Sequence, residues 1–302
     1  MHFTAADLPS QKGKCFLVTG ANTGLGFEAS RHLAGKGARV LLACRNEAKA
    51  RDAMARIAVE VPDADLAFVP LDQGDLASIR RAAVIVDAEP RIDVLVNNAG
   101  IMIPPLGRTV DGFESQMGVN HMGCFALTGL LLPKLAQTPG ARVVITASVA
   151  HRRGRIDWDD LDARNGYKAW DRYGASKLAN LLFLLELDRR LRAAGSPVTA
   201  VGCHPGVAAT ELGRHIAVAR VLTALLRPLL NSAEMGAWPT LQAAADDIAP
   251  GEYYGPQSLG EMRGASGVAK RTARARDLVA AQRLWDISVA RTGVDPGLPP
   301  AV

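Results

Sequence analysis

Short apolar runs alternate with helix-forming segments through the first two thirds of this 302-residue chain, and this alternation constrains the fold more than any other feature. The apolar runs lie at residues 15–19 (CFLVT), 39–44 (RVLLAC), 66–71 (LAFVPL), 94–97 (VLVN), 142–147 (RVVITA) and 198–203 (VTAVGC). Helical spacing of apolar residues is found at 27–36, 47–59, 76–88, 113–135 and 173–192. Nearly continuous apolar runs are typical of parallel strands that helices cover on both faces. The pattern predicts an α/β fold: a doubly wound parallel sheet with helices on both faces, whose ligands bind beyond the carboxyl ends of the strands.

The last third of the chain continues the same domain. Residues 207–230 are strongly apolar, 232–247 have helical spacing, and 252–254 predict a short last strand. Residues 277–292 predict a C-terminal helix, and a Pro/Gly tail follows it. No linker or low-complexity tract separates this part, which is too short to fold alone. We therefore expect a single domain over residues 1–302.

Composition excludes several classes of protein. There is no run of 18 uncharged apolar residues and no signal-peptide core, so we expect a cytoplasmic protein without a membrane anchor. The cysteines Cys15, Cys44, Cys124 and Cys203 are scattered in or near apolar runs, which is typical of buried thiols in a reducing compartment rather than of disulfides or a metal site. The net charge of +5 comes without an aromatic stacking array. It therefore favours an anionic cofactor over a nucleic acid, and we expect no nucleic-acid partner.

A glycine-rich turn follows the first predicted strand. The sequence Thr19-Gly20-Ala21-Asn22-Thr23-Gly24-Leu25-Gly26 also opens the first predicted helix. Glycines there let the backbone approach a pyrophosphate, and the helix N-terminus attracts the same anion. The spacing is G-x-x-x-G-x-G instead of the common G-x-G-x-x-G, so only the mechanism carries over. The position after strand one predicts a dinucleotide site.

The end of the second strand indicates which dinucleotide binds. An acid at this place binds the ribose 2′-hydroxyl of NAD, whereas an arginine accommodates the 2′-phosphate of NADP. The chain has Cys44 and Arg45 here, and its next acid, Glu47, falls within the following predicted helix. The alternative interpretation is that Arg45 is an ordinary surface charge at the start of the next helix and does not bind the cofactor. We predict NADP(H) as the cofactor.

A tyrosine and a lysine stand four residues apart at the start of a long predicted helix. Tyr173 and Lys177 therefore share one face of that helix, and Ser148 closes an apolar run 25 residues earlier. A nearby cation favours the phenolate and lowers the pKa of a tyrosine toward the range of a general acid–base. Taken alone, the Tyr/Lys motif has an alternative interpretation, since such a pair is also common by chance on protein surfaces. Together with the dinucleotide signals, the pair predicts a catalytic site.

These motifs, in this order, resemble the short-chain dehydrogenase/reductase family over nearly the whole chain. The further matching motifs are Asp72 after the third strand, Asn97-Asn98-Ala99-Gly100 after the fourth, Asn120 in the next helix, and Pro205-Gly206 with Thr210. The segments ACRN at 43–46, VNHMGCFALTGLLLPKL at 119–135, YGASKLANLLF at 173–183, HPGVAAT at 204–210 and YYGP at 253–256 are similar to the retinol dehydrogenase-like branch, which includes the WW-domain oxidoreductase. That branch is typically NADP(H)-linked and acts on apolar aldehydes, ketones and alcohols.

The resemblance implies a Rossmann-type fold and a role for each matching residue. Tyr173 would exchange the proton, Lys177 would lower its pKa and bind the nicotinamide ribose, Ser148 would bind the substrate oxygen together with Tyr173, and Asn120 would hold a water in the relay to Lys177. The cofactor would contact Gly20, Asn22, Thr23, Gly24, Leu25, Gly26, Arg45, Asp72, Gln73, Asn98, Ala99, Gly100, Tyr173, Lys177, Pro205, Gly206, Val207 and Thr210. Gln73 departs from the aliphatic residue usual in the family, so we expect a more polar adenine pocket.

The resemblance also divides the domain and leaves alternatives open. Residues 14–203 would form the dinucleotide-binding and catalytic core, 204–260 the substrate-side segment, and 261–302 the C-terminal helix and tail. The leading hypothesis is an NADP(H)-dependent oxidoreductase acting on an apolar aldehyde, ketone or alcohol. Reduction of an activated carbon–carbon double bond is an alternative chemistry, since the same tyrosine would protonate carbon. A catalytically silent NADP(H)-binding module is the alternative from another class.

Two further expectations concern the substrate and the assembly. Residues 215–226 are too apolar for a solvated loop and predict a lid over an apolar substrate, with Trp158, Tyr167 and Trp170 as an aromatic wall. The helix after Lys177 is apolar nearly all round, which predicts a homodimer or homotetramer whose interface uses Phe183 or Leu184. Cover by the helix predicted at 277–292, within a monomer, is the alternative.

Overall fold

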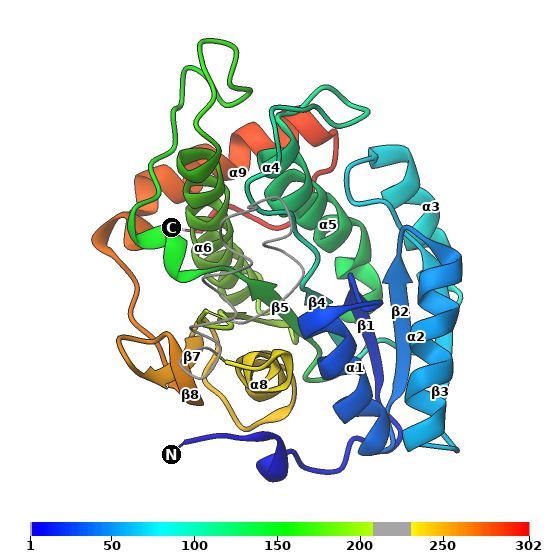
Figure 1. The fold of residues 1–302 in the computed structure, drawn as a ribbon. Coiled ribbons are helices and arrows are strands. Elements are labelled where there is room, and N and C mark those ends of the chain that lie inside the picture. The colour runs from blue at the N-terminus through cyan, green and yellow to red at the C-terminus, as the bar shows by residue number, and fades with distance from the viewer. Residues whose placement is uncertain (1, 208–230, 302) are drawn as a thin grey trace.

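The computed structural model describes residues 2–207 and 231–301, and its centre is one eight-stranded sheet (Figure 1). The strands are β1 Cys15–Thr19, β2 Arg39–Cys44, β3 Asp65–Pro70, β4 Val94–Asn97, β5 Arg142–Thr146, β6 Thr199–Cys203, β7 Tyr253–Ser258 and β8 Arg263–Val268. Their order is β3-β2-β1-β4-β5-β6-β7-β8, and every pairing is parallel except that of β7 with β8. The order reverses between β1 and β4, which is the point where doubly wound sheets bind ligands. The predicted fold class is confirmed.

Helices cover both faces of the sheet. Helices α1 (Gly24–Gly35), α2 (Glu47–Glu60) and α8 (Ala233–Ala245) pack on one face. Helices α3 (Leu76–Asp87), α5 (Gly123–Leu135) and α6 (Ala169–Ala193) pack on the other, and α9 (Leu278–Thr292) lies against α6. The shorter pieces are the 3₁₀ turns Ala5–Asp7 (η1), Val149–Arg152 (η3) and Ala273–Arg276 (η6), the single turn α4 (Ser115–Met117) and the π-helical turn Gly118–Met122. None of the helices in the described parts of the chain is long and apolar enough to span a membrane.

Strand β1 shows why the apolar runs become buried strands. Successive side chains of a strand point to opposite faces. Leu17 joins the cluster beneath α3, α5 and α6, while Phe16 and Val18 join the cluster beneath α1, α2 and α8. All three are buried, and such burial stabilises by roughly 1.5–3 kcal/mol for each large apolar side chain. A run without polar alternation is therefore what a strand needs between two helical layers.

Two local features differ from the sequence-based expectations. The single helix expected at 113–135 is interrupted: α4 begins where Glu114 accepts hydrogen bonds from Gln116 N and Met117 N, and the π-helical turn follows before α5. Strand β8 was not expected, and it lies inside the segment assigned to a C-terminal helix and tail. Its sequence, RGASGV, carries little strand signal, because the pairing with β7 and not intrinsic propensity holds it in place.

The prediction that Phe183 or Leu184 forms a subunit interface is wrong. Both side chains are buried inside the chain. Phe183 packs against Phe125 of α5 and Trp285 of α9, with ring centroids 5.2 Å and 6.1 Å apart. Helix α9 therefore covers the apolar side chains of α6 that do not face the sheet, which is the alternative stated above for the helix predicted at 277–292. The oligomeric state itself stays a prediction, and a dimer would have to use another surface.

Candidate active site

A cavity of about 410 Å³ lies at the carboxyl ends of the strands. Of the predicted site residues it is lined by Gly20, Asn22, Thr23, Gly24, Leu25, Arg45, Asp72, Gln73, Asn98, Ala99, Gly100, Tyr173, Lys177 and Pro205. Gly26, Asn120, Ser148, Gly206 and Val207 are not part of its lining. Thr210, and the lid expected at 215–226, lie outside the described residues. The structure thus brings predicted residues from six distant segments to one cavity.

The glycine turn between β1 and α1 is shaped for close approach. Gly20 and Gly24 have φ angles of +66° and +58°, a conformation that favours glycine. A Cβ on Gly26 would lie 2.5 Å from Gly20 O and 2.6 Å from the amide nitrogen of Asn98. Asn98 Nδ2 donates to Thr19 O at 2.8 Å, which ties this turn to the end of β4. The free N–H groups of the α1 N-terminus open on the cavity and fit a pyrophosphate.

Two cations stand at the end of β2. The Arg45 side chain is 79% exposed, and its Nη1 lies 3.7 Å from Asp72 Oδ2. Lys49, one helical turn later, lines the same cavity, and Asn46 Oδ1 accepts from Lys49 N at 2.9 Å to start α2. Glu47 instead pairs with Arg51 at 2.6 Å and is not part of the lining. Lys49 was not predicted from the sequence, although its place in the first turn of the helix that follows Arg45 was an available signal.

The segment after β3 closes the end of the cavity near β2. Asp72 Oδ1 accepts from Gly74 N at 2.9 Å, which fixes the turn. Gln73 is only 6% exposed, and within residues 2–207 and 231–301 neither polar atom of its side-chain amide has a hydrogen-bond partner. A buried amide without partners is costly, so its presence in the lining marks this end as polar, as expected from the departure at this position.

Tyr173, Lys177 and Ser148 meet at the other end. Ser148 caps η3, and its Oγ accepts from Ala150 N at 3.2 Å. Burial raises the pKa of the Tyr173 phenol above its ordinary value, and a hydrogen bond with Ser148 offsets only part of this. Lys177 Nζ lies 5.9 Å from the centre of the Tyr173 ring and donates to Thr146 O at 3.2 Å. Burial lowers the pKa of Lys177 to about 8.

Burial therefore dominates the pKa of Tyr173, and the lowering of that pKa by Lys177 stays a prediction. Both side chains are almost fully buried, and loss of water disfavours the charged form of each. The phenol is thus neutral and able to donate a proton at pH 7.

Asn120 supports the loop that follows β4. It lies in the π-helical turn, where its Oδ1 accepts from Ile101 N at 2.8 Å and its Nδ2 donates to Ser176 Oγ at 2.9 Å. A Cβ on Gly100 would lie 3.0 Å from Asn120 Oδ1 and 3.4 Å from Lys177 Nζ. Asn120 therefore couples this loop to the helix that carries Tyr173 and Lys177. The water relay implied for Asn120 stays a prediction.

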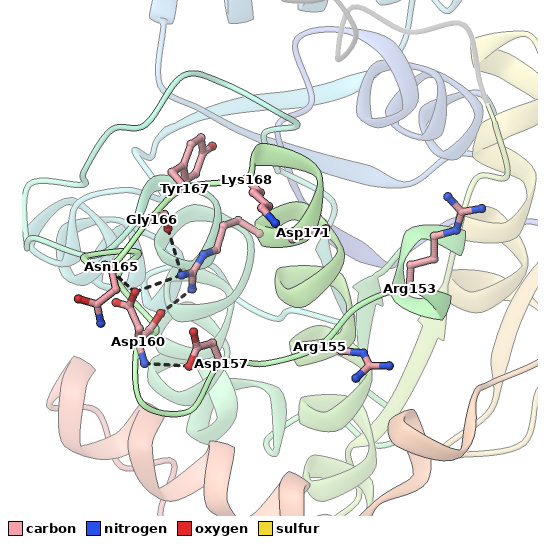
Figure 2. A pocket seen from close by; sticks show the side chains of 10 residues that line it. Arg153, Arg155, Asp157, Asp160, Asn165, Gly166, Tyr167, Lys168 and Asp171 are labelled. Atoms are coloured by element: carbon pink, nitrogen blue, oxygen red, sulfur yellow. Dashed lines mark hydrogen bonds and ion pairs between the residues drawn. The ribbon is translucent and has the colours of Figure 1, made fainter.

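A second hollow, of about 640 Å³, lies in the segment between Ser148 and Tyr173 (Figure 2). Its lining is mostly charged: Arg153, Arg155, Asp157, Asp160, Asn165, Gly166, Tyr167, Lys168, Asp171 and Arg172. The expected aromatic wall does not form. Tyr167 donates to Pro104 O at 2.7 Å, Trp158 packs beneath the Arg283 guanidinium at 4.7 Å, and Trp170 is 61% exposed. The polar sequence between these aromatics, with its Asp160–Arg172 pairing, separates them.

Residues 14–220 match the family model described as short chain dehydrogenase. The chain belongs to the short-chain dehydrogenase family. It is 40% identical over 289 residues to human retinol dehydrogenase 12, covering 93% of this chain and 87% of that protein. The protein is therefore an oxidoreductase of alcohol or carbonyl groups that binds a nicotinamide cofactor, and it is retinol dehydrogenase-like.

Solved structures agree with the fold. The crystal structure of an uncharacterised protein from Mycobacterium paratuberculosis is 42% identical, has a TM-score of 0.82, and covers 98% of this chain and 99% of that chain. A short chain dehydrogenase from Shigella flexneri, determined with NADP, is 26% identical with a TM-score of 0.63 and covers 82% of this chain and 97% of that chain.

Proposed function

We propose that this protein transfers hydride between NADP(H) and an apolar aldehyde, ketone or matching alcohol, with Tyr173 as the general acid–base. The single observation that carries the proposal is the composition of one continuous cavity. One end holds a glycine cradle and, at the end of β2, the cations Arg45 and Lys49, and the other end holds a buried phenol beside a buried ammonium.

The residues fit an NADP-type cofactor in three respects. Gly20 and Gly24 line the cavity in backbone conformations that favour glycine, and the N-terminus of α1 attracts the pyrophosphate. Arg45 and Lys49 suit a 2′-phosphate, and each charge-assisted contact contributes roughly 1.5–3 kcal/mol. The Shigella flexneri relative was determined with NADP, which supports the same choice.

When bound, the cofactor would supply or accept the hydride. In the reduction direction, Tyr173 donates its phenolic proton to the substrate oxygen, and its raised pKa keeps that proton in place at pH 7. Ser148, hydrogen-bonded to Tyr173, polarises the same oxygen. Lys177 stabilises the phenolate that remains, because its ammonium stays charged below a pKa of about 8. Asn120 and Ser176 hold this part of α6 in register with the loop after β4.

The apolar substrate class rests on the relatives. Human retinol dehydrogenase 12 is named for retinol, an apolar alcohol. The residues that line the charged hollow of Figure 2 precede Tyr173 in sequence, and this hollow is separate from the cavity that contains Tyr173 and Lys177. A protein that only binds NADP(H) without catalysis needs the glycine turn and the cations but not a catalytic group. The presence of Ser148, Tyr173 and Lys177 together therefore favours a catalytic function.

The test is the oxidation of NADPH, followed at 340 nm, with a panel of carbonyl compounds. We expect higher kcat/KM for medium-chain and ring-bearing aldehydes and ketones than for glyceraldehyde or pyruvate. Enones in the same panel, with product analysis, separate carbonyl reduction from reduction of the double bond. Faster turnover of glyceraldehyde or pyruvate would contradict the apolar substrate class.

The catalytic assignment is tested by Tyr173→Phe. Loss of the proton donor should lower kcat by about 10²–10⁴-fold while the Kd for NADPH stays within about twofold. Tyr254→Phe, which removes a hydroxyl from a buried tyrosine near the start of β7 and outside the cavity lining, is the matched control and should keep wild-type turnover. If Tyr173→Phe retained a tenth of the wild-type kcat, Tyr173 would not be the acid–base.

A further inference from the structure

A chain of buried polar contacts lies behind the Tyr173 end of the cavity and joins three segments that are far apart in sequence. Arg152, at the end of η3, donates to Glu261 Oε2 at 2.6 Å and to Gly260 O at 3.2 Å. His204 follows β6, and its Nε2 lies 3.4 Å from the same Oε2. Glu261 thus stands between the segment that follows Ser148 and the turn that follows β6.

The hairpin between β7 and β8 is bent to place this carboxylate inward. Leu259, Gly260 and Glu261 have φ angles of +49°, +68° and +70°. A left-handed conformation is unfavourable for leucine and glutamate, so the surroundings must hold it. The bend turns Leu259 and Met262 outward, 54% and 45% exposed, and leaves Glu261 only 9% exposed. The strained backbone of this hairpin therefore places one carboxylate, that of Glu261, in a buried position.

Hydrogen bonding fixes the proton of His204 on one ring nitrogen. Gly206 N donates to His204 Nδ1 at 3.1 Å, so Nδ1 must carry the lone pair. The proton of the neutral ring is then on Nε2, which lies 3.4 Å from Glu261 Oε2 and, within the described residues, makes no hydrogen bond of ordinary geometry. Burial lowers the pKa of His204, so the ring is neutral at pH 7. A Cβ on residue 255 would lie 1.9 Å from Nε2, so only Gly255 admits the ring here.

Glu261 is held as an anion. Burial acts to raise the pKa of its carboxyl, but the nearby His204 ring, the hydrogen bond from Lys270 N and the Arg152 guanidinium outweigh it and lower the pKa. Oε1 accepts from Lys270 N at 3.0 Å, and Arg152 supplies the opposite charge. An ionised carboxylate accepts hydrogen bonds only, so it selects the tautomer of His204 that carries a proton on Nε2.

The turn that His204 holds belongs to the cofactor cavity. Pro205 lines the cavity together with Tyr173 and Lys177. Since hydride must pass close to the proton donor, the nicotinamide end of the cofactor has to lie at this end. The turn is also pinned from the hairpin side: Val207 N donates to Met262 O at 3.0 Å, and a Cβ on Gly206 would lie 2.3 Å from that oxygen.

We propose that Glu261 is a positioning residue for the nicotinamide end of the cofactor. Through His204 it holds Gly206 N and so orients the turn after β6, and through Arg152 it fixes that turn relative to the Ser148 segment. The inference rests on the proposed function, because it needs NADP(H) as the ligand.

The experiment compares two ligands that differ only in the nicotinamide. NADPH and 2′-phospho-ADP-ribose are titrated by calorimetry into the wild type and Glu261→Gln. A glutamine offers either a donor or an acceptor to His204, so the tautomer is no longer fixed. We expect Glu261→Gln to weaken NADPH by about 10- to 100-fold, because the buried His204 ring loses the carboxylate that faces it, and to leave 2′-phospho-ADP-ribose within about twofold. Glu60→Gln, an exposed acid on α2, is the matched control.

A second background tests whether Glu261 acts through His204. In His204→Asn the side-chain oxygen can accept from Gly206 N and needs no tautomer partner. There, adding Glu261→Gln should change the affinity ratio of the two ligands by less than about twofold. Where Glu261→Gln does not fold, Glu261→Asp takes its place: the shorter side chain withdraws from His204, and the same selective loss of NADPH affinity is expected.

The outcomes separate the two ideas. A wild type that binds neither ligand contradicts the proposed function. A wild type that binds both, with variants that weaken both ligands equally or neither, overturns the positioning role of Glu261. An equal effect of Glu261→Gln in the wild-type and His204→Asn backgrounds also overturns it.

Discussion

Lys177 occupies the most demanding environment of any single residue in the site. Its ammonium is buried, its hydrogen bond is to Thr146 O, and burial lowers its pKa to about 8. Phosphates in the same cavity would favour the charged form again. Single residues thus carry the chemistry, but their pKa values depend on burial and on what fills the cavity.

We expect Arg45 and Lys49 to determine the preference for NADP(H) over NAD(H). We expect Arg45→Ala to reduce the preference for NADPH over NADH by about ten- to a hundredfold, and Lys49→Ala to reduce it further in the double variant. Arg51→Ala, on the same helix but paired with Glu47, should leave the preference unchanged. The ratio of Kd values, measured by fluorescence titration, checks this. A wild type with equal affinity for both cofactors would show that these cations do not read the 2′-phosphate.

Among the elements, α5 and α6 illustrate how context redirects a helical pattern. Residues 113–135 have helical spacing throughout, yet the turn at Gly118–Met122 widens to a π-helix. A π-helical turn is typical of functional sites, and here it carries Asn120. Helix α6 is apolar nearly all round because it has both the sheet and α9 to cover.

The packing of α9 predicts the cost of removing its anchor. Trp285 is buried, meets Phe125 edge to face at 5.2 Å, and lies beneath the Arg190 guanidinium at 4.4 Å. We expect Trp285→Ala to lower the free energy of unfolding by about 3–5 kcal/mol. Val279→Ala, on the same helix but 80% exposed, should change it by less than about 0.5 kcal/mol. Urea denaturation measures both, and a cost below 1 kcal/mol for Trp285→Ala would mean that α9 does not hold this face.

For the molecule as a whole, buried histidines set the response to acid. Burial lowers the pKa values of His121 and His151 to about 4, whereas an unfolded histidine titrates near ~6.5. Between these values the unfolded chain binds protons that the folded protein does not. Stability is therefore fully present above pH 6.5 and is lost as the pH falls toward 4, by about 1.4 kcal/mol per pH unit for each histidine. The raised pKa of Glu114 works in the opposite direction and offsets part of this loss.

The measurement is urea denaturation at pH 7, 6 and 5. His121→Gln keeps a donor for Ser288, which His121 Nε2 contacts at 2.9 Å, but does not titrate. Its free energy of unfolding should fall less steeply with acid than that of the wild type, by about one histidine's share. Parallel slopes for the two proteins would rule out His121 as a source of the acid sensitivity.

The sequence by itself determined the doubly wound sheet, the bounds of β1, β2 and β4, and most of the segments that line the cavity, although not Lys49. It could do so because apolar runs, glycine turns and helical spacing are local signals that burial between two helical layers enforces. The Tyr173–Lys177 pair was also readable, since four residues on a helix fix a common face.

Only the tertiary structure decided the remaining features, because each depends on a neighbour remote in sequence. Strand β8 exists through its pairing with β7, and Phe183 is buried through α9. The raised pKa of Tyr173 follows from burial that no spacing reveals. Glu261 and His204 meet although 57 positions separate them, since a strained hairpin and a strand end converge there. Contacts of this kind arise from packing, and packing is a property of the whole chain.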